Sequence, residues 1–394
     1  MYVFKQFSGA GQHLLHPSTH PPGSSLSSYS SIHIFESTPH GLLTGAEWND
    51  LNHWDFFMCL MNDSNISSIA EMWSFCNFRH YMLEIYAGES PLAGARVILE
   101  DSCGRMLWTA ISDNKGRVFL FVEPFIKNNN LCPEKADGQK EKPEEFKVRI
   151  MFNNLLIKES LPALSKNERY IYRININSTD SLTNPNLKDL DLMIWLDITG
   201  SMSDELSYLR KELSSVVENI KTSYPQTRIR ISMNFYVGKY DRNTLHPHPF
   251  TESVEEVLGY LTEEKCYGGA QEAVDMAIKD GVFNHTWSDT ARARLLLIIM
   301  DEPPEVSSES LSNLRTAITG AAEKGIRIIP VLASTSESSL QFLVRPLAIY
   351  TGGTFLFLTD DSGIGDPHVK PLVGDYTLEY FDQLMVRVIA EALV

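Results

Sequence analysis

The sequence has few basic residues and no cysteine pattern. Lys and Arg number 34 against 50 Asp and Glu, which gives a formal net charge of −16. A nucleic-acid partner requires a basic surface that neutralises phosphates, so this balance argues against one. The five cysteines form no CxxC pair and have no regular spacing, which supports neither a zinc site nor a disulfide framework.

Long hydrophobic runs are also missing. The longest, "LMIWL" and "LLLIIM", have the length of strands, whereas a membrane-spanning helix needs about 20 apolar residues. The start "MYVFKQFSGAGQHLLHP" lacks the apolar segment of a secretory signal. We therefore expect no membrane-spanning segment. We also expect that the protein either stays inside the cell or starts here without its export signal.

Three catalytic fingerprints are absent: the GxSxG elbow, the P-loop and the glycine-rich dinucleotide-binding motif. No histidine partner for a nucleophilic serine is evident. We therefore expect a protein that is not an enzyme.

The N-terminal part divides into two segments. Residues 1–38 are rich in Ser, His and Pro and carry too little apolar surface to fold, so we expect a disordered tail. Residues 39–77 place aromatic side chains near helical spacing, and Thr44 could cap a helix. This pattern predicts a helical lead that packs on the next domain.

From residue 78 the hydrophobic period changes to two. Short apolar runs are separated by the turn signals "GESPLAG" and "SDNKG", which predicts a small antiparallel β-sandwich over 78–176 with a long polar loop at 127–145. The stretches "GESPLAGARVILED" and "AISDNKGRVFLF" resemble sandwich modules related to the carboxypeptidase regulatory domain. The resemblance implies a structural spacer or stalk. A polar linker follows at 177–189.

Residues 190–394 alternate between strand and helix patterns. The runs "LMIWL", "IRISMNFYV", "LLLIIM", "IRIIPVLA" and "TFLFL" are almost continuously apolar, and helical patterns lie between them. Apolar strands of this kind are typical of a parallel sheet covered on both faces. The sequence therefore predicts an α/β fold whose C-terminal domain is a doubly wound, mostly parallel sheet.

The stretch "LMIWLDITGSMSDELSYL" places polar side chains where the first of these strands ends. Asp197 closes the strand, and Thr199 and Ser201 follow at alternate positions. Ligands of open α/β sheets bind at the carboxyl ends of the strands, and such oxygen donors suit Mg²⁺, Mn²⁺ or Ca²⁺. Helix capping is the alternative. It explains Ser203 and the acidic residues after it, but not an aspartate on an apolar strand followed by two hydroxyls.

These residues carry a second resemblance. "DITGS" is similar to the D-x-S/T-x-S signature of the von Willebrand factor type A (VWA) domain, a Rossmann-like fold with a metal-ion-dependent adhesion site. "IIMDEPPE", "KGIRIIPVLAS" and "LAIYTGGTFLFLTD" resemble later strand ends of that family. The resemblance implies that Asp197, Thr199 and Ser201 are metal ligands and that Asp301 is the outer carboxylate.

The remaining ligand of the family is usually a Thr or Asp in a glycine-containing loop. The corresponding stretch here is "KCYGGAQEAVDMAI", in which Ala270 stands at the expected position. Gln271 and Glu272 are the residues that could substitute for it. This departure keeps open the alternative of a structural or interaction protein whose metal site is degenerate.

An ion held by few protein charges keeps open coordination positions and stays electrophilic. The resemblance therefore implies divalent-cation-dependent adhesion or scaffolding, in which a protein partner donates an Asp or Glu carboxylate to the ion. It also implies a location at the cell surface, in the envelope or outside the cell. Metal-dependent hydrolysis is a further alternative, and it requires a general base and a second carboxylate near Asp197.

Overall fold

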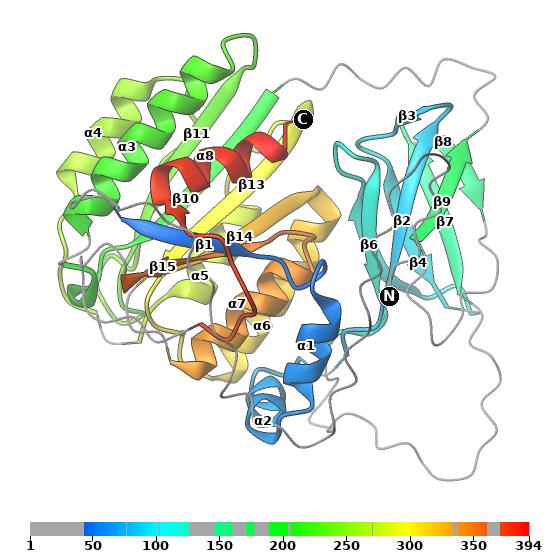
Figure 1. The fold of residues 1–394 in the computed structure, drawn as a ribbon, viewed down its shortest axis with the longest axis horizontal. Helices are drawn as coiled ribbons and strands as arrows, with labels where there is room; N and C mark the ends of the chain where they lie inside the picture. Colours follow the sequence, from blue (N-terminus) through cyan, green and yellow to red (C-terminus); the bar gives the residue numbers. More distant parts are fainter. Residues whose placement is uncertain are drawn as a thin grey trace, which may run out of the picture.

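The structure is a computed structural model that describes most of the chain (Figure 1). The predicted tail (1–38), the polar loop (127–145) and residues 177–188 of the predicted linker lie outside the described part. The described residues are 43–75, 77–101, 103–125, 146–153, 155–159, 171–176, 189–203, 206–269, 271–333, 337–360 and 371–393.

An eight-stranded, mostly parallel sheet forms the larger part of the fold, as the alternating pattern predicted. Its strand order is β12-β11-β10-β13-β14-β15-β1-β16. The five strands from β11 to β15 in this order run parallel, whereas β12 and β1 pair antiparallel to their neighbours. The strands are β1 (Thr44–Trp48), β10 (Asp189–Asp197), β11 (Ile229–Tyr236), β12 (Leu245–His246), β13 (Ala291–Met300), β14 (Ile326–Leu332), β15 (Phe355–Thr359) and β16 (Glu379–Tyr380).

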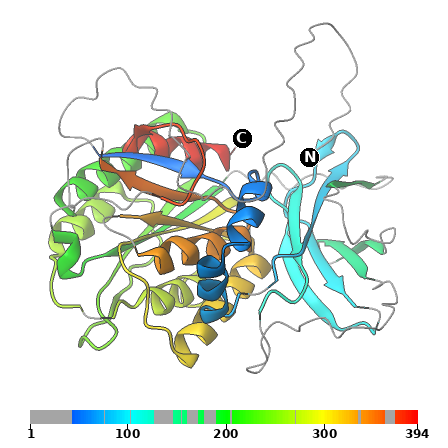
Figure 2. The ribbon, with the colours of Figure 1, turned by 60° about the horizontal axis from the view of Figure 1, so that its bottom comes forward.

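Helices cover both faces of this sheet (Figures 1 and 2). Along β10, Ile194 and Leu196 face one apolar core, and Met193 and Trp195 face the other. This alternation explains why the strand is apolar throughout. The first core is shared with α3 (Leu206–Ser223), α4 (Val254–Glu263) and α8 (Phe381–Glu391), and the second with α5 (Val274–Phe283), α6 (Ser308–Lys324) and α7 (Ser338–Ile349).

The predicted helical lead at 39–77 is wrong at its start. Thr44 is not a helix cap, because it begins strand β1, which pairs antiparallel with β15 in the main sheet. Its hydroxyl oxygen lies 2.8 Å from that of Thr359. Helices follow only later, as α1 (Trp54–Met61) and α2 (Ser64–Met72). Residues 44–48 form a strand because they pair with the edge of β15. The local spacing of apolar residues could not reveal this distant partner.

The region predicted as an antiparallel sandwich contains two four-stranded sheets. Their strand orders are β3-β2-β6, with β9 also paired to β2, and β5-β4-β7-β8. All pairings are antiparallel except the parallel pair of β2 and β9. Side chains alternate equally in both strand directions, so the pattern could not distinguish them. The strands are β2 (His80–Ala87), β3 (Ser90–Pro91), β4 (Arg96–Glu100), β5 (Met106–Ile111), β6 (Arg117–Phe121), β7 (Lys147–Phe152), β8 (Leu155–Glu159) and β9 (Ile171–Ile176).

These smaller sheets pack directly against the main α/β part. The ring of Tyr350, which follows α7, stacks on Phe78 with 5.4 Å between centroids and meets Phe121 edge-on at 4.7 Å. Arg327 donates to the Asp113 carboxylate at 2.6 Å across the same boundary. Buried residues on both sides form one continuous apolar core. The expectation of a spacer that holds the α/β part at a distance is therefore wrong.

No helix within the described ranges combines the length and the apolar content that crossing a membrane requires.

A buried ion pair fastens the segment after β1 to α7. Asp50 and Arg345 are only 3% and 2% exposed, and the Arg345 guanidinium donates to the Asp50 carboxylate. The indole N–H of Trp48 donates to the same oxygen at 2.9 Å. Burial raises the pKa of Asp50 and lowers the pKa of Arg345, so each charge depends on the other.

We expect Asp50→Asn to lower the free energy of unfolding by about 3–5 kcal/mol, because the Arg345 charge stays buried without its counterion. The matched control is Glu252→Gln, which breaks the exposed pair with Arg228 and is expected to cost at most about 1 kcal/mol. Urea unfolding measures both. Equal costs for the two variants would contradict the structural importance of the buried pair.

Candidate metal centre

Two neighbouring central strands deliver aspartates to the same edge of the sheet. Asp197 is the last residue of β10, and Asp301 directly follows β13. Because β10 and β13 are parallel neighbours, their carboxyl ends lie together. Both side chains are buried, with 0% and 4% exposure. The sequence analysis named both residues as candidate ligands, and the topology brings them together.

The loop before α5 adds a third carboxylate. Its backbone is tied to the loops after β10 and β11, because the Tyr267 N–H donates to the Ile198 carbonyl at 3.1 Å and the Ala273 N–H to the Val237 carbonyl at 3.2 Å. Gly269 has φ +89°, and a Cβ there would lie 2.5 Å from Thr199 Cγ2. Only glycine allows this close approach, which places Glu272 inside the site.

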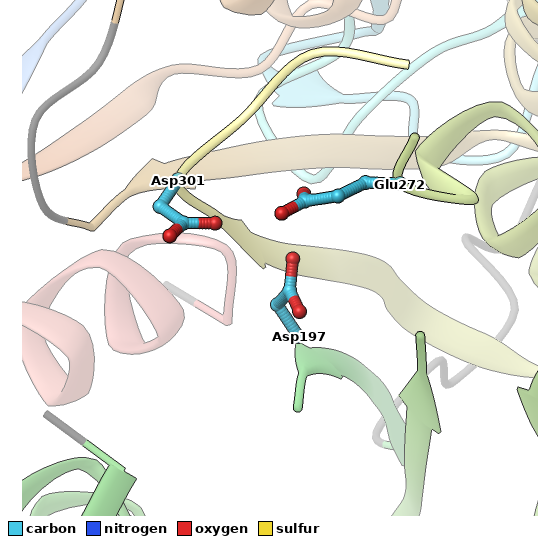
Figure 3. A group of neighbouring side chains, drawn as sticks. All are labelled: Asp197, Glu272 and Asp301. Carbon is cyan, nitrogen blue, oxygen red and sulfur yellow. The ribbon is translucent and has the colours of Figure 1, made fainter. Parts of the chain in front are cut away.

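Figure 3 shows Asp197, Glu272 and Asp301 pointing toward one another. Their carboxylate oxygens lie within 4.8 Å of each other, and in the described part of the chain this is the one acidic cluster with such spacing. Each residue has one buried oxygen without a hydrogen-bond partner, namely Asp197 Oδ2, Glu272 Oε2 and Asp301 Oδ1. Buried acceptors are normally satisfied, so the centre of this cluster requires a donor or a cation.

Two hydroxyls complete the site. The Thr199 N–H donates to Asp197 Oδ1 at 2.7 Å, and its hydroxyl donates to Glu272 Oε1 at 3.3 Å. Ser201 Oγ lies 2.9 Å from Thr199 Oγ1 at the exposed rim. The structure thus brings Asp197, Thr199, Ser201 and Asp301 together, and their roles as metal ligands stay a prediction.

The two weaker candidates have different outcomes. Glu272 is 2% exposed and belongs to the cluster. Gln271 is exposed at φ +61°, and its backbone carbonyl accepts from the Lys239 N–H, so the suggestion that its side chain substitutes as a ligand finds no support in this geometry. Ala270 lies outside the described residues.

The electrostatics show what these carboxylates lack. Burial raises the pKa of Asp197 to about 6, and the charge of Asp301 adds to the effect, although a hydrogen bond from Glu272 in its protonated form and hydrogen bonds from Thr199 oppose it. Burial also raises the pKa of Glu272 well above its ordinary value, reinforced by Asp197. Carboxylates that share a buried site stay protonated unless a metal cation neutralises their negative charges.

Tyr236 is a member of the site that the sequence analysis did not name. It pairs with Asp197 in the sheet register, and its hydroxyl donates to the Ile299 carbonyl at 3.1 Å. Burial raises the pKa of Tyr236, and the charges of the three acid residues raise it further. The phenol therefore stays neutral and forms part of the wall. Its strand position in an apolar run gave no signal of this role.

The donor set fits a hard divalent cation. The three carboxylates and the hydroxyls of Thr199 and Ser201 all offer oxygen. The cluster contains neither the imidazole nor the thiolate ligands that zinc favours. The unsatisfied oxygens are acceptors that a cation at their centre would satisfy. They do not distinguish Mg²⁺ from Mn²⁺ or Ca²⁺, which share oxygen ligands.

A scan against protein-family models and a search of curated proteins find no match for this chain. Among solved structures, it is similar to an aerotolerance-related membrane protein from Bacteroides fragilis NCTC 9343 that carries multiple mutations to serine. The TM-score is 0.37 and the identity 12%, over 51% of this chain and 99% of that one. It is also similar to a pilus adhesin from Lactobacillus rhamnosus GG, with a TM-score of 0.38 and 8% identity, over 53% of this chain and 31% of that one. Likeness at this level does not show what this chain binds.

The raised pKa values predict a pH-dependent response to magnesium. The folded site binds protons more tightly than the unfolded chain, so without metal the stability contributed by Asp197 is lost as pH rises from 3.8 toward about 6. Mg²⁺ binds the deprotonated site, so we expect it to raise the melting midpoint little at about pH 5 and clearly at about pH 8. Calorimetry with Mg²⁺ or EDTA measures this. An equal shift at both pH values would contradict binding at these carboxylates.

Proposed function

We propose that this chain binds a divalent cation at the carboxyl edge of its main sheet and uses the cation-bearing face to bind a protein partner, without catalysis. The observation that carries the proposal is the group of three buried carboxylates, each with an unsatisfied oxygen. Burying three such groups together is unfavourable unless protons or a cation compensate them. Mg²⁺ is the first candidate, with Mn²⁺ and Ca²⁺ as alternatives.

The position of the cluster supports the resemblance to the VWA domain. The Asp-x-Thr-x-Ser loop leaves the end of a central parallel strand, and Asp301 leaves the end of the next strand in the sheet. Asp197, Glu272 and Asp301 would hold the ion, together with the hydroxyls of Thr199 and Ser201. Ser201 lies at the exposed rim, so this side of the site is the one from which a partner would approach.

The third carboxylate changes how a partner can reach the ion. Three ionised acids carry more negative charge than a divalent cation can neutralise, so the loaded site is a weaker acceptor for a further acid. We propose that a partner Asp or Glu competes with Glu272 for a coordination position. In a site where a neutral hydroxyl replaced Glu272, the ion would stay more electrophilic.

Loss of one acid should weaken uptake of the cation itself. We expect Asp301→Asn to weaken Mg²⁺ binding by about tenfold or more, because it removes a charge from the coordination sphere and keeps the side-chain shape. Titration calorimetry measures the affinity. The control is Asp289→Asn, an exposed aspartate just before β13 at the opposite end of the sheet. Equal Mg²⁺ affinity in both variants and the wild type would rule out the proposed site.

Glu272→Thr tests the competition with a partner acid. We expect this variant to bind Mn²⁺ more weakly and, once loaded with Mn²⁺, to bind acetate more tightly than the wild type, because one negative charge leaves the ion. Water-proton relaxation by the bound Mn²⁺ reports the displacement of water by acetate.

The matched control for this variant is Gln271→Asn. The side chain at 271 is exposed, and asparagine tolerates its positive φ. This control should leave both affinities unchanged. If Glu272→Thr kept the wild-type acetate affinity, the proposed competition between Glu272 and a partner acid would be wrong. That result would not contradict the cation site itself.

A further inference from the structure

A small cleft lies at the opposite end of the main sheet from the carboxylates. Its volume is about 60 Å³. The walls come from both parts of the molecule: the end of β5 and the start of β6 on one side, and the starts of β13 and β14 with the end of α6 on the other. In Figure 1 this boundary runs between the main sheet and the smaller sheets.

Four arginines line this cleft, which is unusual in a chain of net charge −16. Arg117 belongs to β6, Arg292 and Arg294 to β13, and Arg327 to β14. Asp113 is the one carboxylate among the lining residues. The cleft is therefore locally positive. The negative surface elsewhere is largely screened beyond about 8 Å at physiological ionic strength.

Asp113 is already fully engaged. One carboxylate oxygen accepts the backbone N–H groups of Lys115 and Arg117, both at 2.8 Å. The other oxygen accepts from Arg327 Nη2 at 2.6 Å and lies 3.5 Å from Arg117 Nε. One carboxylate thus serves two of the four arginines, and it has no oxygen left for the others.

The other two arginines have no carboxylate in contact among the described residues. Arg294 donates to the backbone carbonyls of Ser288 and Lys324 at 2.9 and 3.3 Å. Burial lowers its pKa, although Asp191 and Asp289 act on it from a distance in the opposite direction. The acid with the larger effect, Asp191, is already paired, because it accepts two hydrogen bonds from Arg230.

Arg292 is the least satisfied of the four. Its Nε is buried and has no hydrogen-bond partner in the described part of the chain. The Nε of Arg117 likewise lacks a hydrogen bond, although Asp113 Oδ2 lies 3.5 Å away. Buried donors of this kind are costly unless an acceptor reaches them.

We propose that this cleft binds a small oxyanion of the phosphate class, either inorganic phosphate or a compact phosphomonoester. Its several acceptor oxygens match the fork of donors that each guanidinium presents. A volume of about 60 Å³ exceeds the roughly 15 Å³ that one water requires, but it is too small for a segment of a macromolecule.

Such an anion would contact both parts of the molecule at once. Arg117 comes from the smaller sheets, and the other three arginines come from the main sheet. Binding would therefore stabilise their packing as well as neutralise the arginines. The site shares no residue with the carboxylate cluster and does not depend on the proposed function.

The experiment uses the full chain in EDTA, so that phosphate cannot bind through a cation. Inorganic phosphate and phosphoserine are titrated by calorimetry against the wild type, Arg292→Gln and Arg228→Gln at constant ionic strength. Arg292 makes no described hydrogen bond through its side chain, so its replacement should not disturb the fold. Arg228→Gln removes the same charge from a side chain that is 54% exposed at a surface pair with Glu252.

We expect saturable binding of at least one of the two anions to the wild type and to Arg228→Gln. In Arg292→Gln this binding should be weaker by about tenfold or more, the loss expected for a charge-assisted hydrogen bond. Melting curves should agree with these affinities. At equal ionic strength, phosphate should raise the melting midpoint more than acetate does in the wild type and in Arg228→Gln, and less so in Arg292→Gln. Absence of saturable binding in the wild type, or equal affinity in both variants, would overturn the proposal.

Discussion

The mutual repulsion of three buried carboxylates is the constraint on which the main site depends. Asp197, Glu272 and Asp301 lie within reach of one shared centre, away from water. Folding has to supply protons or a cation there, because isolated buried charges are strongly unfavourable. The raised pKa values of Asp197 and Glu272 show that protons can neutralise the site. Binding of a cation is the alternative way to neutralise it.

The fold maintains this arrangement through elements that have little freedom. β10 is packed on both faces, so its end cannot move without disturbing two cores. The loop that carries Glu272 is tied by backbone hydrogen bonds to its neighbours and passes Thr199 at a position where only glycine fits. A site built in this way is preorganised for the cation that we propose.

The two candidate sites lie at opposite ends of the main sheet. The carboxylate cluster lies at the carboxyl ends of its parallel strands, and the arginine-lined cleft lies at the amino ends, where the smaller sheets pack. The shared core around Tyr350 packs the two parts together at that boundary. The smaller sheets thus complete the arginine-lined cleft, and they do not act as a distant spacer.

The sequence by itself determined the alternation of strands and helices and placed Asp197 and Asp301 at the ends of apolar strands, because apolar periodicity is a local property. It could not place β1 in the sheet, distinguish a parallel β9 from an antiparallel one, or decide between Gln271 and Glu272. The first two outcomes depend on which strand edges are available for pairing, at β15 and at β2. The third depends on the left-handed backbone at Gln271, after which the Glu272 side chain enters the site. Only tertiary structure decides these, because the atoms that compete for each position come from segments far apart in the chain.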